Sequence, residues 1–100
     1  MDKSEAIDKV RRYKLLLKDY FDLEKVYLYG SYAKEINRED SDIDVAIVVS
    51  QLPEDFFSLN PLLWKLRRMI DDRIEPIIID KNNDQLGFLD EIIRTGIEIA

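Results

Sequence analysis

The sequence contains no cysteine and no histidine. Without cysteine, the chain has no disulfide and offers no thiolate to a metal ion. Without histidine, it lacks the usual zinc ligand, the usual general base and every Ser-His or Cys-His nucleophile pair. Any catalytic chemistry in these 100 residues must therefore use carboxylates, hydroxyls, lysine and arginine.

Long apolar runs are also missing. None approaches the roughly 18 residues of a transmembrane helix, and the charged start, MDKSEAIDKVRRYK, lacks the apolar stretch of a signal peptide. We therefore expect a cytoplasmic protein with no membrane contact. Hydrophobic residues still make up 46% of the chain, which is enough for a core. The length predicts a single domain over residues 1–100.

Basic residues are fewer than acidic residues. The chain has 15 Lys and Arg against 21 Asp and Glu, a net charge of −6. An extensive nucleic-acid surface needs a basic face, so we expect none. A small nucleotide bound with Mg²⁺ remains compatible, because the metal cancels the repulsion between like charges. A basic protein partner is compatible as well.

Two short apolar runs enclose a polar segment near the middle of the chain. The runs are rich in β-branched and aromatic residues and predict strands at 25–29 and 43–49. The second run has almost no polar break, which favours a central strand that is buried on both faces. The polar residues therefore lie where one strand ends and the next begins.

This polar segment opens with Gly30-Ser31 and closes just before Asp42 and Asp44. Glycine permits a sharp turn, and the hydroxyl and backbone N–H groups of such a turn suit a phosphate. Alternate residues of a strand share a face, so the two carboxylates repel each other unless a divalent cation such as Mg²⁺ binds them. The pattern suggests a metal–nucleotide site; the alternative is an ordinary turn with an acidic strand end.

The remaining pattern predicts helices packed on a sheet, in the order α-β-α-β-α-β-α. An Asp2–Glu5 capping box begins the first helix, and Asn60-Pro61 is a strong helix start. The predicted helices are residues 2–21, a short helix in SYAKEI after Gly30, residues 60–71 and residues 84–95 approximately. The third predicted strand is residues 73–79. Residues 37–41 and 50–60 are predicted loops, and the final IEIA is a short extended piece.

Each longer helix has an expected buried side. The residues are Ile7, Val10, Tyr13, Leu17 and Tyr20 in the first; Leu62, Leu63, Leu66, Met69 and Ile70 in the second; and Leu86, Leu89, Ile92 and Ile93 in the last, which Gly96 caps.

Two features have alternative interpretations. The aromatic segment Phe56–Leu59 either covers the core or forms an exposed surface for a partner. Glu75 is an acid among isoleucines in the third strand, where Pro76 favours an edge position. It either sits at an exposed edge or faces the same cavity as Asp42 and Asp44.

The run GSYAKEINREDSDIDVAIV resembles the signature of the DNA polymerase beta nucleotidyltransferase superfamily. RIEP followed by isoleucines is similar to its third motif. By length and element order the chain looks like the minimal nucleotidyltransferases, which often act as antitoxins beside a HEPN-domain ribonuclease toxin. The resemblance implies a nucleotidyltransferase fold, an α/β (α+β) arrangement with a small mixed β-sheet and helices packed on it.

The resemblance also implies roles for single residues. Gly30 and Ser31 would hold the β- and γ-phosphates of ATP or another nucleoside triphosphate, and Ser41 would belong to the same nucleotide site. Asp42 and Asp44 would bind two Mg²⁺ ions. The implied reaction is attack of a hydroxyl on the α-phosphorus with loss of pyrophosphate.

Glu75 takes the place of the third carboxylate, which in the family helps to hold one metal and activates the hydroxyl. The implied function is transfer of AMP to a hydroxyl of a partner protein, a HEPN-type toxin. Glu35 and Glu75 depart from the glycine and aspartate that are common at these positions. Two other interpretations therefore stay open: an antitoxin that neutralises its partner by contact alone, and an acidic nucleotide or metal sensor. A homo-oligomer is possible.

Overall fold

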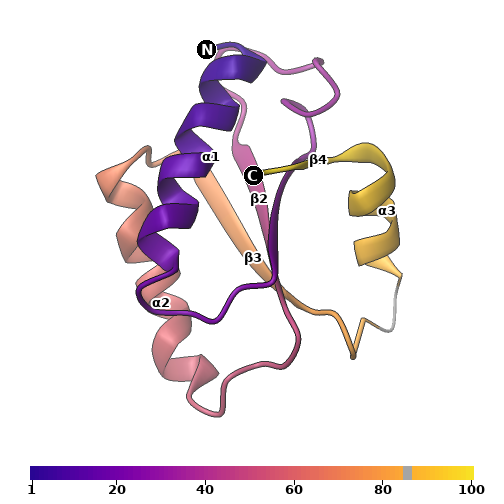
Figure 1. Ribbon diagram of the computed structural model, residues 1–100. Helices are drawn as coiled ribbons and strands as arrows, with labels where there is room; N and C mark the ends of the chain where they lie inside the picture. The colour runs from indigo at the N-terminus through magenta and orange to yellow at the C-terminus, as the bar shows by residue number, and fades with distance from the viewer. Residues whose placement is uncertain (85–86) are drawn as a thin grey trace.

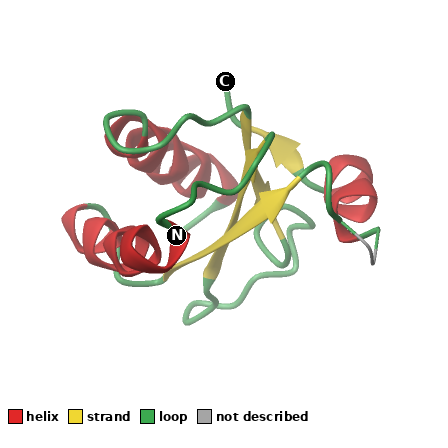
Figure 2. Cartoon of the chain, turned by 90° about the horizontal axis from the view of Figure 1, so that it is seen from below, coloured by secondary structure: helices red, strands yellow, loops and turns green. Residues whose placement is uncertain are grey.

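In the computed structural model, which describes residues 1–84 and 87–100, three helices cover a four-stranded sheet. Helices α1 and α2 lie on one face of the sheet and α3 lies on the other (Figures 1 and 2). The elements in chain order are α1 (Lys3–Leu17), β1 (Lys25–Tyr29), β2 (Ile43–Val49), α2 (Phe56–Leu66), the 3₁₀ turn η1 (Arg67–Met69), β3 (Ile74–Asp80), α3 (Phe88–Thr95) and β4 (Ile97–Glu98).

The sheet is mixed, as predicted, with the strand order β3-β2-β1-β4. Strand β1 runs antiparallel to β2 and β4, whereas β3 runs parallel to β2. A parallel pair requires a crossover, and α2 with η1 supplies it. Pro76 lies in the edge strand β3, where its missing N–H costs no ladder bond on the outer side.

Alternating side chains of the strands build two cores. The larger core lies between the sheet and helices α1 and α2. The smaller core lies between the sheet and α3, and the buried members of this smaller core are Tyr27, Ala46, Val48, Ile79 and Ile92. Strand β2 contributes to both cores and is internal in the sheet, which confirms the predicted central strand. In the part of the chain that the structure describes, no helix is long and apolar enough to cross a membrane.

Helix α1 begins as predicted, because the Asp2 side chain accepts a hydrogen bond of 2.9 Å from the Glu5 N–H. It ends at Leu17 rather than at residue 21. The N–H groups of Tyr20 and Phe21 both donate to the Leu17 carbonyl, so the chain turns and Phe21 reaches the core. Tyr20 is 51% exposed, and its predicted place on the buried side is wrong.

The predicted start of α2 is wrong by four residues. The helix begins at Phe56 and contains Pro61, because hydrogen bonds from Ser58 and Leu59 to the Asp55 carbonyl build an earlier first turn. Leu59 packs against the core, whereas Phe57 is 90% exposed, so the segment covers the core only in part; a partner surface at its exposed side stays a prediction. The change to a 3₁₀ turn at η1 rotates the following side chains, and Met69 is 68% exposed instead of buried.

The last helix is shorter than predicted. It begins at Phe88, and the Asp84 carboxylate accepts a bond of 2.7 Å from the Leu89 N–H. Ile92 is buried as expected, but Ile93 is exposed. Leu86 lies outside the described residues. Gly96 caps the helix, β4 is the predicted extended piece, and β3 is displaced by one residue from the predicted 73–79.

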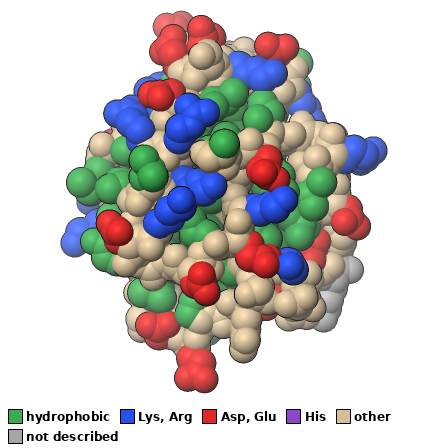
Figure 3. Space-filling model, viewed as in Figure 1, with side chains coloured by type: hydrophobic (Ala, Val, Ile, Leu, Met, Phe, Trp, Pro, Cys, Tyr) green, Lys and Arg blue, Asp and Glu red, His purple; other side chains and the backbone are tan. Residues whose placement is uncertain are grey.

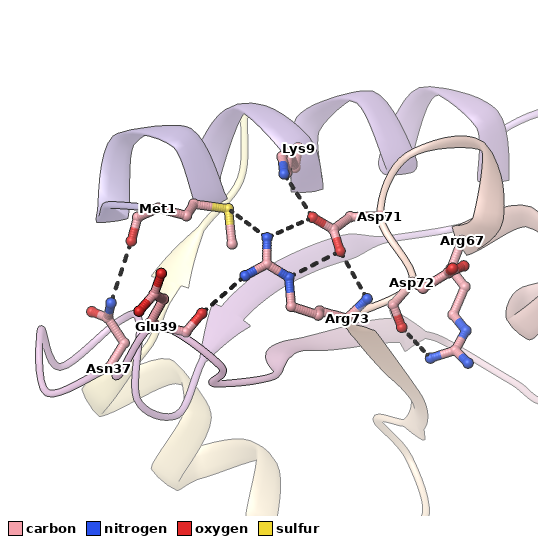
Figure 4. A network of polar contacts seen from close by, with 8 residues as sticks. All are labelled: Met1, Lys9, Asn37, Glu39, Arg67, Asp71, Asp72 and Arg73. Atoms are coloured by element: carbon pink, nitrogen blue, oxygen red, sulfur yellow. Dashed lines mark hydrogen bonds and ion pairs between the residues drawn. The ribbon is translucent and has the colours of Figure 1, made fainter.

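A polar network ties the start of β3 to α1 and to the loop before β2 (Figure 4). Lys9 donates to Asp71 Oδ2 at 2.6 Å, and the Arg73 guanidinium donates to both Asp71 carboxylate oxygens, at 3.2 and 3.0 Å. Arg73 also donates to the Glu39 carbonyl at 3.2 Å. The hydrogen bonds from Arg73 and then Lys9 hold the pKa of Asp71 well below its usual range.

Replacing Asp71 by Asn should lower the free energy of unfolding by about 2–3 kcal/mol, because charge-assisted hydrogen bonds to a mostly buried group are lost. The pKa of Asp71 is lowered in the folded protein, so its contribution is complete above the ordinary pKa of about 4. It fades as the pH falls below that value. The gap between wild type and variant in urea denaturation should therefore narrow from pH 7 toward pH 3.

The matched control is Asp72→Asn, because Asp72 is exposed and uses only its backbone carbonyl, which accepts from Arg67. Equal losses of stability in the two variants would show that the network does not stabilise the fold.

Candidate functional site

Strand register brings two of the three predicted acids side by side. Asp44 in β2 is the direct partner of Glu75 in β3, and on its other side Asp44 is the partner of Tyr29, the last residue of β1. Residues in register share a face of the sheet. Their side chains lie on the α3 side, since Ala46, two residues after Asp44, belongs to the core under α3. Asp42 precedes β2 by one residue.

Electrostatics show that the three acids, here called the carboxylate cluster (Asp42, Asp44 and Glu75), influence one another. Burial raises the pKa of Asp44 to about 6, and the charges of Glu75 and Asp42 add to the effect. The pKa of Glu75 is also raised, by partial desolvation and by charge and hydrogen bonding with Asp42. None of the ion pairs among residues 1–84 and 87–100 involves the cluster. The charge of Arg67 partly opposes the rise at Glu75, but the cluster as a whole keeps a net negative charge, which favours a cation.

The donor set fits Mg²⁺ that binds together with phosphate oxygens. Among the described residues, no three Asp, Glu, His or Cys side chains already form a metal cage. Asp42 and Glu75 are exposed and only Asp44 is partly buried. Mg²⁺ keeps several waters and takes one or two carboxylates plus phosphate oxygens, so a closed protein cage is not needed. The three acids form an open cluster, and the metal site that the sequence predicts stays a prediction.

Position 30 must be glycine because the Asp44 carboxylate occupies the space that a side chain there would fill. Its φ of +75° is left-handed, and a Cβ added there would lie 2.3 Å from Asp44 Oδ2. The sequence predicted that glycine lets a ligand approach the main chain. The structure shows that the group already in close approach is the Asp44 carboxylate, so any side chain at position 30 would displace the central acid of the cluster.

The short helix predicted after Gly30 is a single turn. Lys34 N–H donates to the Gly30 carbonyl, and the bonds Glu35 to Tyr32 and Ile36 to Ser31 close a Schellman motif. Glu35 has a φ of +59°, the left-handed conformation that ends this motif and favours glycine. The turn keeps Ser31 beside Gly30 at the end of β1, as the phosphate-binding hypothesis requires.

Ser41 closes the loop that leads to Asp42. Its Oγ accepts a hydrogen bond of 2.7 Å from the Arg38 N–H, and its own N–H donates to the Arg38 carbonyl at 3.1 Å. The structure thus gives Ser41 a positioning contact in the loop. A direct contact between Ser41 and a nucleotide stays a prediction.

Tyr29 is a site residue that the sequence reasoning missed. Burial raises its pKa to about 12, and the charges of Asp44 and Glu75 contribute. Its ring packs edge-on against Phe88 of α3, with 5.8 Å between ring centroids. The sequence did offer a signal for Tyr29, namely its position directly before Gly30. The last residue of β1 must face the start of an antiparallel β2, which carries Asp44.

Replacing Asp44 by Asn should stabilise the metal-free protein at pH 8 by about 1–2 kcal/mol, after allowance for solvent screening. The pKa of Asp44 is raised in the folded protein, so its charged form destabilises the fold above pH 6 and the penalty disappears toward pH 4. Thermal unfolding should show wild type, but not the variant, stabilised by millimolar Mg²⁺ with nucleotide. Identical Mg²⁺ responses would contradict the assignment.

Replacing Glu35 by Gly should raise the free energy of unfolding by about 0.5–1 kcal/mol, because glycine adopts the left-handed conformation without steric cost. Lys34→Gly is the matched control, since Lys34 has no positive φ and glycine there should destabilise the turn. Urea denaturation of both variants tests this, and a destabilised Glu35→Gly protein would refute the strain argument.

Comparison with known proteins shows which family the sequence matches. Residues 12–100, which include every predicted site residue, match the family model described as "Polymerase beta, Nucleotidyltransferase". The chain is 32% identical over 101 residues to "Putative protein adenylyltransferase MJ0141" of Methanocaldococcus jannaschii, covering 95% of this chain and 99% of that protein.

Solved structures share the fold. A structure described as "Crystal structure of the toxin-antitoxin with AMP-PNP" superposes with a TM-score of 0.69 at 20% identity, covering 94% of this chain and 72% of that one. A mutant of the toxin-antitoxin MntA-HpeT gives a TM-score of 0.60 at 17% identity, covering 92% and 72% of the two chains. The predicted nucleotidyltransferase fold is confirmed, and the chain belongs to the polymerase beta nucleotidyltransferase family.

Proposed function

We propose that this protein is a Mg²⁺-dependent adenylyltransferase, which transfers AMP from ATP to a hydroxyl of a partner protein. The observation that carries the proposal is the register of Asp44 with Glu75, next to Asp42 and directly against Gly30. Support for the protein acceptor comes from the name of the Methanocaldococcus jannaschii relative, which this chain matches over nearly its whole length. Support for ATP comes from the structural neighbour that is described as a toxin-antitoxin with AMP-PNP.

The residues have distinct roles in this proposal. Gly30, Ser31 and Ser41 position the triphosphate at the end of β1, and Asp42 and Asp44 hold two Mg²⁺ ions. The metal ions, when bound, stabilise charge on the attacking and leaving oxygens. Glu75 also helps to hold one of them.

The transfer itself is a substitution at phosphorus. The acceptor oxygen forms a bond to the α-phosphorus while the bond from that phosphorus to the bridging oxygen of the β-phosphate breaks. Pyrophosphate leaves, and the proton of the acceptor hydroxyl goes to Glu75.

The partner in this proposal is a HEPN-type toxin, for which the protein is the antitoxin. Two structural neighbours are described as toxin-antitoxins, and that relationship motivates the choice of partner. AMP attached to a toxin hydroxyl would add bulk and negative charge at the toxin's own site and so block it.

A second candidate function is neutralisation of the toxin by contact alone. The observation that favours it is the open state of the carboxylate cluster, in which no three of the described metal-binding side chains form a cage. Glu75, with one more methylene than aspartate, is also exposed. A displacement on the order of 1 Å can cost roughly 10²-fold in rate.

Incubation with ATP, Mg²⁺ and the proposed HEPN-type partner protein should increase the intact mass of that partner by one AMP group. Asp42→Asn and Asp44→Asn should each lower the rate by at least about 10²-fold, because each removes a metal ligand. Asp40→Asn, a change at an exposed acid of the same loop, is the control and should retain activity. Toxin neutralised equally well by all three variants without ATP would establish the contact mechanism instead.

A further inference from the structure

Charge is divided unevenly between the two sides of the molecule. The segments 3–18 and 56–69, which comprise α1, α2 and η1, carry nine Lys and Arg but only two Asp and Glu, a net charge of +7. Because the whole chain carries −6, the remainder carries −13. Lys and Arg side chains gather over α1 and α2, with hydrophobic side chains between them (Figure 3). The overall acidity thus conceals a basic helical layer.

The outward sides of the two helices form one surface. The exposed stripe of α2 and η1 follows helical spacing through Phe57, Pro61, Trp64 and Arg68. The exposed stripe of α1 and its C-cap consists of Asp8, Arg11, Leu15 and Lys18. The opposite sides of both helices are buried in the larger core, so these stripes face away from the sheet. Since the helices cover the same sheet face (Figure 2), we call their outward surface the α1–α2 face.

Some cations of this layer already contact other residues of the chain, and others do not. Lys9 pairs with Asp71, Lys14 donates to the Ile99 carbonyl, and Arg12 lies 3.7 Å from Asp8. Among the described residues, four cations form no ion pair or hydrogen bond: Arg11, Lys18, Lys65 and Arg68. Their charge is available to a ligand.

The same surface exposes large apolar side chains. Leu15 is 60% exposed, Trp64 38% and Phe57 90%. The Arg67 guanidinium lies 4.8 Å from the centre of the Trp64 ring and is itself fixed by the carbonyls of Asp72 and Ile74. Trp64 is therefore ordered before any partner arrives, which lowers the entropic cost of binding.

We propose that the α1–α2 face is the docking surface for a protein partner that presents acidic side chains around an apolar patch. Trp, Phe and Arg are enriched at protein interfaces, and the exposed Leu15 adds further apolar contact area. A symmetric dimer through this face would oppose +7 with +7 and is disfavoured. The carboxylate cluster lies on the other side of the sheet, so docking requires neither Mg²⁺ nor ATP.

The test uses the HEPN-type toxin of the proposed function as the probe, and to that extent the inference rests on the proposed function. Its binding is measured by surface plasmon resonance without ATP and Mg²⁺. The charge-reversal variant R11E/R68E should bind at least 10-fold more weakly, mainly through a slower on-rate, and should lose most of the salt dependence. W64A should also weaken binding about 10-fold, by a faster off-rate.

The control R94E reverses an exposed charge on α3 and should bind within twofold of wild type. Equal binding by R11E/R68E and wild type would overturn the docking surface, even if AMP transfer is intact. Binding of the partner without AMP transfer would instead refute the proposed reaction and leave the docking surface standing.

Three other outcomes would also overturn the proposal. The first is wild type that does not bind the probe. The second is a mixed-sequence RNA oligonucleotide that binds in an R11E/R68E-sensitive manner while the probe does not, which would assign the face to RNA. The third is self-association in sedimentation velocity that R11E/R68E abolishes, which would assign it to the acidic side of a second copy.

Discussion

The parallel pairing of β2 with β3 is the interaction on which the candidate site depends. It places Glu75, which lies 31 residues after Asp44 in the chain, directly beside it. Ile43 and Ile74, which precede the two acids, are a buried pair on the opposite face and hold this register. A slip of one residue would turn Glu75 into the core beneath α1 and α2, so hydrophobic burial on one face fixes the acids on the other.

The free energy gained by this strand pairing must exceed the electrostatic cost of holding the three acids close together. The pKa values of Asp44 and Glu75 are raised first by desolvation and then by the neighbouring acids, so the fold holds these carboxylates where their charged forms are less stable than in water. The compensation lies outside the cluster, in buried isoleucines and in the Lys9–Asp71–Arg73 network. Through the Glu39 carbonyl this network also anchors the loop that ends at Asp42.

The sequence predicted what depends on short-range pattern. The three main strands, the Asp2 cap and the Gly30-Ser31 turn beside an Asp42/Asp44 pair all follow from neighbouring residues. Glu75 had two possible interpretations, and the register shows that it is exposed and yet adjacent to Asp44. The α2 start was missed because the Asn60-Pro61 signal is strong locally, whereas the turn built on the Asp55 carbonyl is not visible in the sequence. The Arg73 network and the basic α1–α2 face needed tertiary structure. The network joins residues far apart in the chain, and the net charge averages over surfaces that the fold separates.

The central claim is that Asp42, Asp44 and Glu75 form one cation site that is completed by a nucleotide. The most direct measurement is anomalous diffraction from crystals grown with Mn²⁺ and a non-hydrolysable ATP analogue. The account predicts manganese peaks at about 2.0–2.3 Å from carboxylate oxygens of Asp42 and Asp44, with the triphosphate against Gly30 and Ser31. Manganese and analogue bound elsewhere, with the three carboxylates free of metal, would contradict it.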